Sequence, residues 1–134
     1  MKDETSEQRT DRILKELKAK YPEAKTFDLD GRGMHFVSEV EPTKDHPEYD
    51  RAIEVIIQSR PHKHLKMTQN YTILSGTLEL HVDDEIIHLQ KGDEYTVTPG
   101  KVHWAVSKDE CWLKIYSRPG WTAEDHIVVD LTKD

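Results

Sequence analysis

His62 and His64 are separated by one residue. They begin the segment of this 134-residue chain whose side chains are best suited to binding a metal ion or to catalysis. In an extended strand successive side chains point to opposite faces, so residues two apart share a face. Gln69 follows, and a third histidine, His103, comes shortly after a Pro-Gly turn. If two strands bring these groups together, three imidazoles and one amide oxygen can surround a divalent ion. Imidazole suits zinc, nickel, iron, copper and manganese, and an amide oxygen is a tolerable fourth ligand.

All four groups are neutral, so a bound ion would keep its full positive charge. That favours polarising a carbonyl, or binding an enolate or a diol, over balancing several charged ligands. The alternative is that these are surface histidines of a turn-rich protein, which is the commoner situation for a single histidine. The combined spacing of the pair, the polar residue and the later Pro-Gly turn favours the metal site.

Composition restricts the partners and the compartment. The formal net charge is −7, whereas nucleic-acid binders need a clustered basic face, so we expect a small-molecule ligand and no nucleic acid. Cys111 is the only cysteine, which excludes an intramolecular disulfide and makes a reducing, cytoplasmic compartment the expectation. No apolar run approaches the length of a membrane span, and the N-terminus lacks a hydrophobic signal region, so we expect no membrane partner.

The elements that must position the histidines are mostly strands. A helix is predicted over 6–20, capped by Ser6 and ended by Tyr21-Pro22, with an apolar stripe that would pack it as a lid on one edge of something larger. Strands are predicted at 25–29, 34–40, 52–59, 71–76, 77–82, 86–89, 91–98, 101–107, 111–117 and 127–131. Short strands separated by turn residues indicate a sandwich or barrel. We expect one domain, with 1–22 as helix and linker and 23–134 as the β-barrel.

Two segments, HKHLKMTQNYTILSG and GDEYTVTPGKVHWAVS, resemble the two sequence motifs of the cupin superfamily. In the first family motif, HxH is followed after three or four residues by Glu and after six more by Gly. In the second, Gly is followed after five residues by PxG, after two more by His and after three more by Asn. The positions in register are His62, His64, Gly76, Gly92, Gly100 and His103. Three positions differ from the family motifs: Gln69 replaces the glutamate, Pro99 stands one position later than the family proline, and Ser107 replaces the closing asparagine. The resemblance implies an all-β cupin fold, a double-stranded β-helix or jelly-roll barrel, with a divalent metal (zinc, manganese, nickel or iron) on His62, His64, Gln69 and His103.

Candidate proton-transfer groups lie on strands that would line such a barrel. Tyr71 shares the alternation of Gln69, while Trp112, Lys114 and Tyr116 alternate against Cys111, Leu113 and Ile115, and one of these two sets must face inward. Lys114, Tyr71 and Tyr116 are the candidate catalytic residues, with a solvated lysine and tyrosines that merely form walls as the alternatives. Cys111 is expected to be a buried small hydrophobe. Five other histidines are interpreted as non-ligands: His35, His46, His81, His88 and His126.

The resemblance extends to two kinds of cupin. ILSGTLELHVDDE and PGWTAEDHIVV are similar to the cupin part of bacterial mannose-6-phosphate isomerases, and the ligand set resembles the small cupins that ketonise unsaturated uronates. In the latter an aspartate stands where this chain has Lys114. Both imply proton movement beside a metal-bound sugar carbonyl, so the leading hypothesis is an isomerase- or tautomerase-like cupin acting on, or binding, a sugar, sugar acid or sugar phosphate. The alternatives are an Fe(II)-dependent dioxygenase and a non-catalytic ligand-binding cupin; a homodimer is expected.

Overall fold

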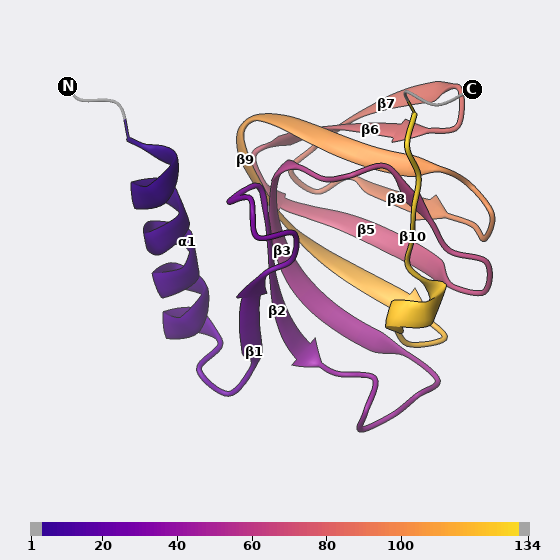
Figure 1. The fold of residues 1–134 in the computed structure, drawn as a ribbon, viewed down its shortest axis with the longest axis horizontal. Coiled ribbons are helices and arrows are strands. Elements are labelled where there is room, and N and C mark those ends of the chain that lie inside the picture. The colour runs from indigo at the N-terminus through magenta and orange to yellow at the C-terminus, as the bar shows by residue number, and fades with distance from the viewer. Residues whose placement is uncertain (1–3, 132–134) are drawn as a thin grey trace.

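The computed structural model describes residues 4–131 and is built mainly of strands, with one α-helix at its N-terminal end (Figure 1). The elements are α1 (Ser6–Lys20), β1 (Lys25–Asp28), β2 (His35–Glu41), β3 (Asp50–Gln58), β4 (His62–Lys63), β5 (Thr68–Ser75), β6 (Thr77–Val82), β7 (Glu85–Gln90), β8 (Glu94–Val97), β9 (His103–Arg118), the 3-10 turn η1 (Ala123–Asp125) and β10 (Ile127–Val128). The predicted helix and the strands predicted at 25–29 and 34–40, which pair antiparallel, are confirmed. Two differences concern the end of the chain: the two strands predicted at 101–107 and 111–117 form the single strand β9, and the final strand is shorter than predicted.

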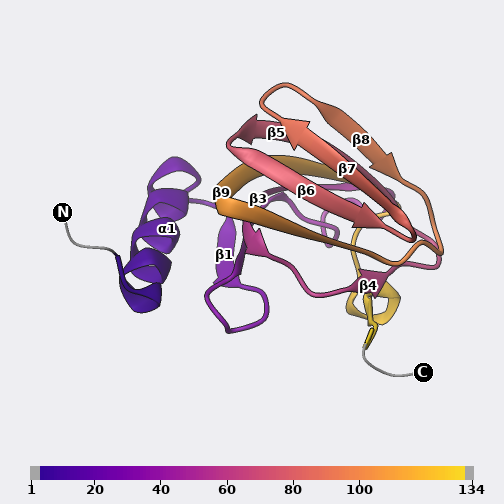
Figure 2. The ribbon, with the colours of Figure 1, turned by 90° about the horizontal axis from the view of Figure 1, so that it is seen from above.

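Strand β9 joins the two layers of the barrel because it pairs with four other strands. Its C-terminal half lies between β3 and β5, and its N-terminal half pairs with β4 and β6. One layer therefore continues through β3 to β2 and β1 and through β5 to β8, while the other contains β6, β7, β4 and β10. The sheet curls back over itself, as Figure 2 shows from above.

The inner face of the curled sheet holds the main hydrophobic core. Cys111, Leu113 and Ile115 of β9 pack there with Tyr71, Ile73 and the apolar residues of β6. The sequence left open which of the two alternating sets on this strand faces inward, and the aliphatic set does. The residues between them, Trp112, Lys114 and Tyr116, therefore point to the outer face.

Helix α1 packs on the outer face of the sheet, and not on an edge as expected. Ile13 and Leu17 are fully buried against Phe36, Val55 and Trp112, which form a second core on this face. The N-cap is Thr5 and not the predicted Ser6: the Thr5 hydroxyl accepts from the Gln8 backbone N–H, and the Gln8 side chain accepts from the Thr5 N–H in return. This capping box satisfies donors that the first helical turn leaves unpaired. Among the described residues, no helix is long and apolar enough to cross a membrane.

Candidate functional site

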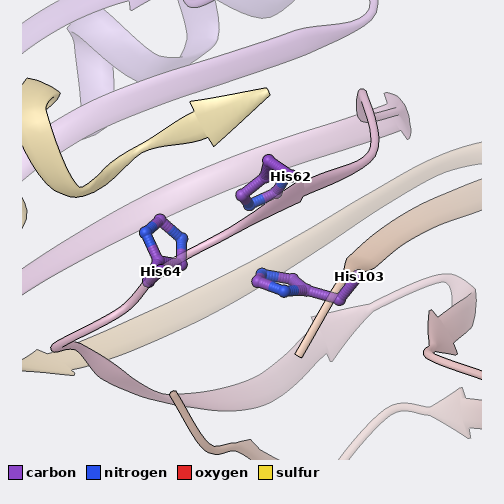
Figure 3. A group of neighbouring side chains, drawn as sticks. All are labelled: His62, His64 and His103. Atoms are coloured by element: carbon purple, nitrogen blue, oxygen red, sulfur yellow. The ribbon is translucent and has the colours of Figure 1, made fainter. Parts of the chain in front are cut away.

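The structure brings His62, His64 and His103 together inside the barrel (Figure 3). His62 on β4 pairs directly with His103 on β9, and His64 lies just beyond β4 on the same face as His62. One ligand nitrogen from each ring lies within 4.8 Å of those of the other two. The three side chains are 6%, 2% and 1% exposed. We call these residues the histidine triad.

Each ring of the histidine triad has its Nδ1 directed at a backbone carbonyl. Nδ1 lies 2.7 Å from the Arg60 oxygen for His62, 2.7 Å from the Asp125 oxygen for His64, and 3.1 Å from the Lys101 oxygen for His103. A carbonyl oxygen can only accept, so each Nδ1 must carry the hydrogen and each Nε2 is left with a lone pair. Metal-binding histidines are commonly oriented by such a hydrogen bond on the second nitrogen.

Burial keeps these rings neutral. Burial lowers the pKa of His103 to about 4, and it likewise lowers the pKa of His62 and His64. The neighbouring rings lower the pKa of His62 and His103 further, because two adjacent imidazolium ions would repel each other. The Nε2 of His64 is buried and has no hydrogen-bond partner among residues 4–131. A buried lone pair without a partner is costly, and a cation among the three Nε2 atoms would satisfy it.

Gln69, the predicted fourth ligand, lies beside the histidine triad on β5. Its Oε1 is 3.2 Å from the Nε2 of His103, and its amide nitrogen donates to the Ser117 hydroxyl at 3.4 Å. With His103 neutral and protonated on Nδ1, two acceptors face each other across that distance. A cation that binds both atoms removes this conflict, so the donor set fits the metal that the sequence motifs imply.

The chain's tail completes one side of the site, which the sequence did not indicate. Strand β10 pairs with β4, and the ring of His126 lies 4.7 Å from that of His62 and 5.6 Å from that of His64, centroid to centroid. From the sequence, His126 was interpreted only as a non-ligand. Burial lowers the pKa of His126, and its Nδ1 is buried without a partner. Only the return of the tail to β4 brings this ring to the histidine triad.

Two carboxylates on β3 were also missed. Asp50, Ala52, Glu54 and Ile56 alternate along this strand, and Ile56 belongs to the inner core, so Asp50 and Glu54 face the interior as well. His35 of β2 forms a 2.5 Å hydrogen bond through Nε2 to Glu54. Glu54 lines the same cavity as Gln69, which places this carboxylate beside the candidate ligands. The signal in the sequence was a carboxylate at inward parity on an otherwise apolar strand.

A cavity of about 300 Å³ is lined in part by Gln69, whose Oε1 lies 3.2 Å from His103 of the histidine triad. Its walls are mixed. Phe27, Val37 and Ala52 supply apolar surface, whereas Asp50, Glu54 and Ser117 supply polar groups. Trp121 lines the same cavity, and its ring lies 5.6 Å from that of His126. The volume suits a single small molecule.

Of the three candidate catalytic residues, the structure brings only Tyr71 to the interior. Tyr71 is buried, and its ring centroid is 6.4 Å from that of His103. Lys114 is exposed on the outer face, between Ile53 and Thr72 of the neighbouring strands. Tyr116 is on the same outer face, with the guanidinium of Arg51 over its ring at 4.7 Å. Alternation along β9 explains both positions, because the inward places belong to Leu113, Ile115 and Ser117.

Comparisons with known proteins agree with this architecture. Residues 54–115 match the Cupin domain family. Similar solved structures include Streptomyces Pac13, described as a unique nucleoside dehydratase (15% identity, TM-score 0.68, covering 81% of this chain and 87% of that one), which has also been solved with uridine. Others are KdgF from Halomonas (19%, 0.63, 73% and 90%) and an RmlC-like cupin from Shewanella frigidimarina (20%, 0.65, 78% and 89%). A comparison with curated proteins found no significant match.

At these identities the structural likeness shows the fold alone. Together with the domain match it defines the class: residues 54–115 match a cupin domain, and the chain has the predicted all-β cupin fold.

Proposed function

We propose that this protein is a metal-dependent cupin that binds a sugar, sugar acid or sugar phosphate and moves a proton beside a carbonyl or enol of that ligand. The observation that carries the proposal is the convergence of three neutral Nε2 atoms next to a ligand-sized cavity. His62, His64, His103 and Gln69 would hold the ion, with zinc, manganese, nickel or iron as candidates. A bound divalent ion supplies Lewis-acid polarisation of a carbonyl or enol oxygen.

The chain's own residues divide the proton transfer between them. Glu54 lines the cavity and is held by His35, so its carboxylate is oriented to accept a proton from a ligand carbon or hydroxyl. Burial raises the pKa of Tyr71, which keeps the phenol protonated and suits it to donate. Lys114 and Tyr116 take no part in this scheme, because their side chains are on the outer face. The sheet and the tail around the histidine triad restrict the access of water.

Elemental analysis of the purified protein tests the metal part. We expect a divalent metal in the parent protein and almost none in a His62→Ala/His103→Ala double variant, with circular dichroism to verify folding. His88→Ala, at an exposed histidine of β7, is the matched control and should keep its metal. A chelator should lower the melting temperature of the parent and of His88→Ala, but not of the double variant. Equal metal content in parent and double variant would refute the proposal.

The reaction part is tested by incubating the metal-loaded protein with sugars, sugar acids and sugar phosphates in D₂O. An isomerase or tautomerase exchanges a carbon-bound hydrogen for deuterium, which NMR detects. The exchange should be slowed in Glu54→Gln and unchanged in Lys114→Met. Oxygen uptake without such exchange would support the Fe(II)-dependent dioxygenase instead, and binding without any change of the ligand would support a non-catalytic cupin.

Assembly is a separate expectation. The strands β7 and β8 end the two layers, and exposed apolar side chains include Val40, Leu65 and Ile86. Unpaired strand edges invite a second chain, so we propose a homodimer. Light scattering during size-exclusion chromatography gives the mass that decides between one chain and two.

A further inference from the structure

We propose that the cavity beside the histidine triad takes an uncharged, hydroxyl-bearing ring, such as a neutral sugar or a nucleoside, and rejects the carboxylate- or phosphate-bearing counterpart. This inference rests on the proposed function and narrows the ligand class of the same site. It departs from the sugar acids and phosphates that the sequence resemblance suggests. The reason is the arrangement of charges around the cavity.

Two carboxylates, Asp50 and Glu54, lie in the inner wall of the cavity. One oxygen of Asp50 accepts from the Thr43 hydroxyl at 3.1 Å and from the Trp121 backbone N–H at 2.5 Å. Within the described part of the chain, the hydrogen-bond partner of Glu54 is His35. Among residues 4–131, no lysine or arginine forms an ion pair with either carboxylate. Burial raises the pKa of Asp50, and the charge of Glu54 raises it further.

The cations near the cavity are already engaged or lie in solvent. Arg51 forms an ion pair at 2.8 Å with Glu41, and Glu41 also lines the cavity. Lys25 is exposed on β1, with its ammonium group 5.6 Å from the centroid of the Phe27 ring. Lys44, the remaining basic residue of the lining, is exposed at the rim. Among the residues that the structure describes, the inner wall therefore offers no basic side chain to receive a carboxylate or a phosphate.

A metal ion on the histidine triad does not reverse this preference. Its ligands are neutral, so a divalent ion adds two positive charges, and the charges of Asp50 and Glu54 offset them. An incoming anion would lose its hydration in a site where two carboxylates already balance the charge of the ion, which is unfavourable in a low-dielectric environment. Hydroxyl groups, in contrast, can donate to both carboxylates and accept from the Ser117 hydroxyl.

The rest of the lining fits the opposite face of such a ring. Phe27, Val37 and Ala52 present an apolar wall, and the C–H face of a sugar or the edge of a base packs well against apolar and aromatic side chains. The cavity thus combines hydrogen-bond acceptors on one wall with apolar surface on another. A neutral polyhydroxylated ring has both kinds of surface.

Matched ligand pairs test the proposal directly. Galactose is compared with galacturonate, and uridine with uridine 5′-monophosphate, by isothermal titration calorimetry on zinc-loaded and on metal-free protein. We expect the neutral member of at least one pair to bind about tenfold tighter than its anion, because placing like charges together is strongly unfavourable. Glu54→Gln and Asp50→Asn should reduce this ratio several-fold, whereas Glu85→Gln, at an exposed carboxylate on β7, should leave it unchanged.

The outcomes separate this inference from the proposed function. Equal or tighter binding of the anion in both pairs overturns the charge selection, and so does the failure of every neutral member to bind a protein that holds its metal. Neither result affects the metal site, which elemental analysis of the double variant decides independently. If the parent protein binds no metal but still prefers the neutral ligand over its anion, the proposed function is refuted and the charge selection stands.

Discussion

The imidazole of His64 donates from Nδ1 to the backbone carbonyl of Asp125 at 2.7 Å, across 61 residues of sequence. The carboxylate of the same aspartate accepts from the backbone N–H groups that follow His64, those of Leu65, Lys66 and Met67, at 2.8 to 3.3 Å. Asp125 therefore orients a candidate ligand ring and holds the loop after it. The tail of the chain acts as part of the site.

Replacing Asp125 by asparagine tests this positioning role. The amide keeps the shape and one acceptor oxygen but loses the charge that binds three N–H groups, so we expect metal affinity to fall by about tenfold. Competition with a chromophoric chelator measures the affinity. Glu124→Gln, an exposed neighbour in η1, removes the same charge without that contact and should bind as the parent does. Equal affinities in all three proteins would show that the carboxylate does not support the site.

Gly100 connects the Pro-Gly turn to the histidine triad. Its backbone φ is +86°, and its N–H donates to the carbonyl of His64 at 2.6 Å. Gly92 has a similar φ of +91° but lies in the turn before β8. A Cβ would meet no atom within 4 Å at either position. An alanine at either glycine therefore costs mainly backbone strain, about 1 kcal/mol.

We expect Gly100→Ala and Gly92→Ala to lose similar stability in denaturant titrations. Only Gly100→Ala should also lose metal affinity, because a change of φ there moves the turn that precedes His103. Chelator competition on both variants makes the comparison. A loss of affinity in Gly92→Ala of the same size would mean that general destabilisation, and not the turn, accounts for the effect.

The convergence of the three histidines could be predicted from local spacing. Period-two alternation is enough to place His62 and His64 on one face, and a turn before His103 is enough to begin a facing strand. The assignment of β9 was harder. Lys108, Asp109 and Glu110 interrupt the apolar alternation and resemble a turn, yet the strand continues through them with an irregularity in its pairing to β3.

The errors arose where both faces of a strand are partly apolar. Trp112 is buried on the outer face because α1 covers it, so hydrophobicity alone could not tell which side of β9 faces the interior, and Lys114 remained a candidate. The roles of Glu54 and His126 depend on contacts between distant segments, the pairing of β2 with β3 and the return of the tail to β4. Such tertiary pairings leave no periodic signal in a single sequence.

Helix α1 stabilises the barrel from outside, so weakening its packing should not change the binding of metal or ligand. Ile13 is fully buried between the helix and the outer face of the sheet. Truncation to alanine leaves a cavity, and we expect Ile13→Ala to lower the free energy of unfolding by roughly 2–5 kcal/mol. Metal content and ligand affinity of the folded fraction should stay unchanged. An altered metal affinity in this variant would show that the helix influences the inner face of the sheet.

Cys111 faces the inner core and is fully buried. Burial raises the pKa of its thiol to about 12, whereas an unfolded cysteine ionises near pH ~8.5. The folded thiol thus stays protonated, and its contribution to stability, present below about pH 8.5, is lost as the pH rises toward the folded value. The melting temperature of the parent should therefore fall more steeply above about pH 9 than that of Cys111→Ala, although the alanine variant starts lower because of its cavity.

A disulfide reagent at pH ~8 should leave the native Cys111 thiol unmodified and should react with it at once in denaturant. Immediate reaction of the native protein would contradict the buried position of this side chain.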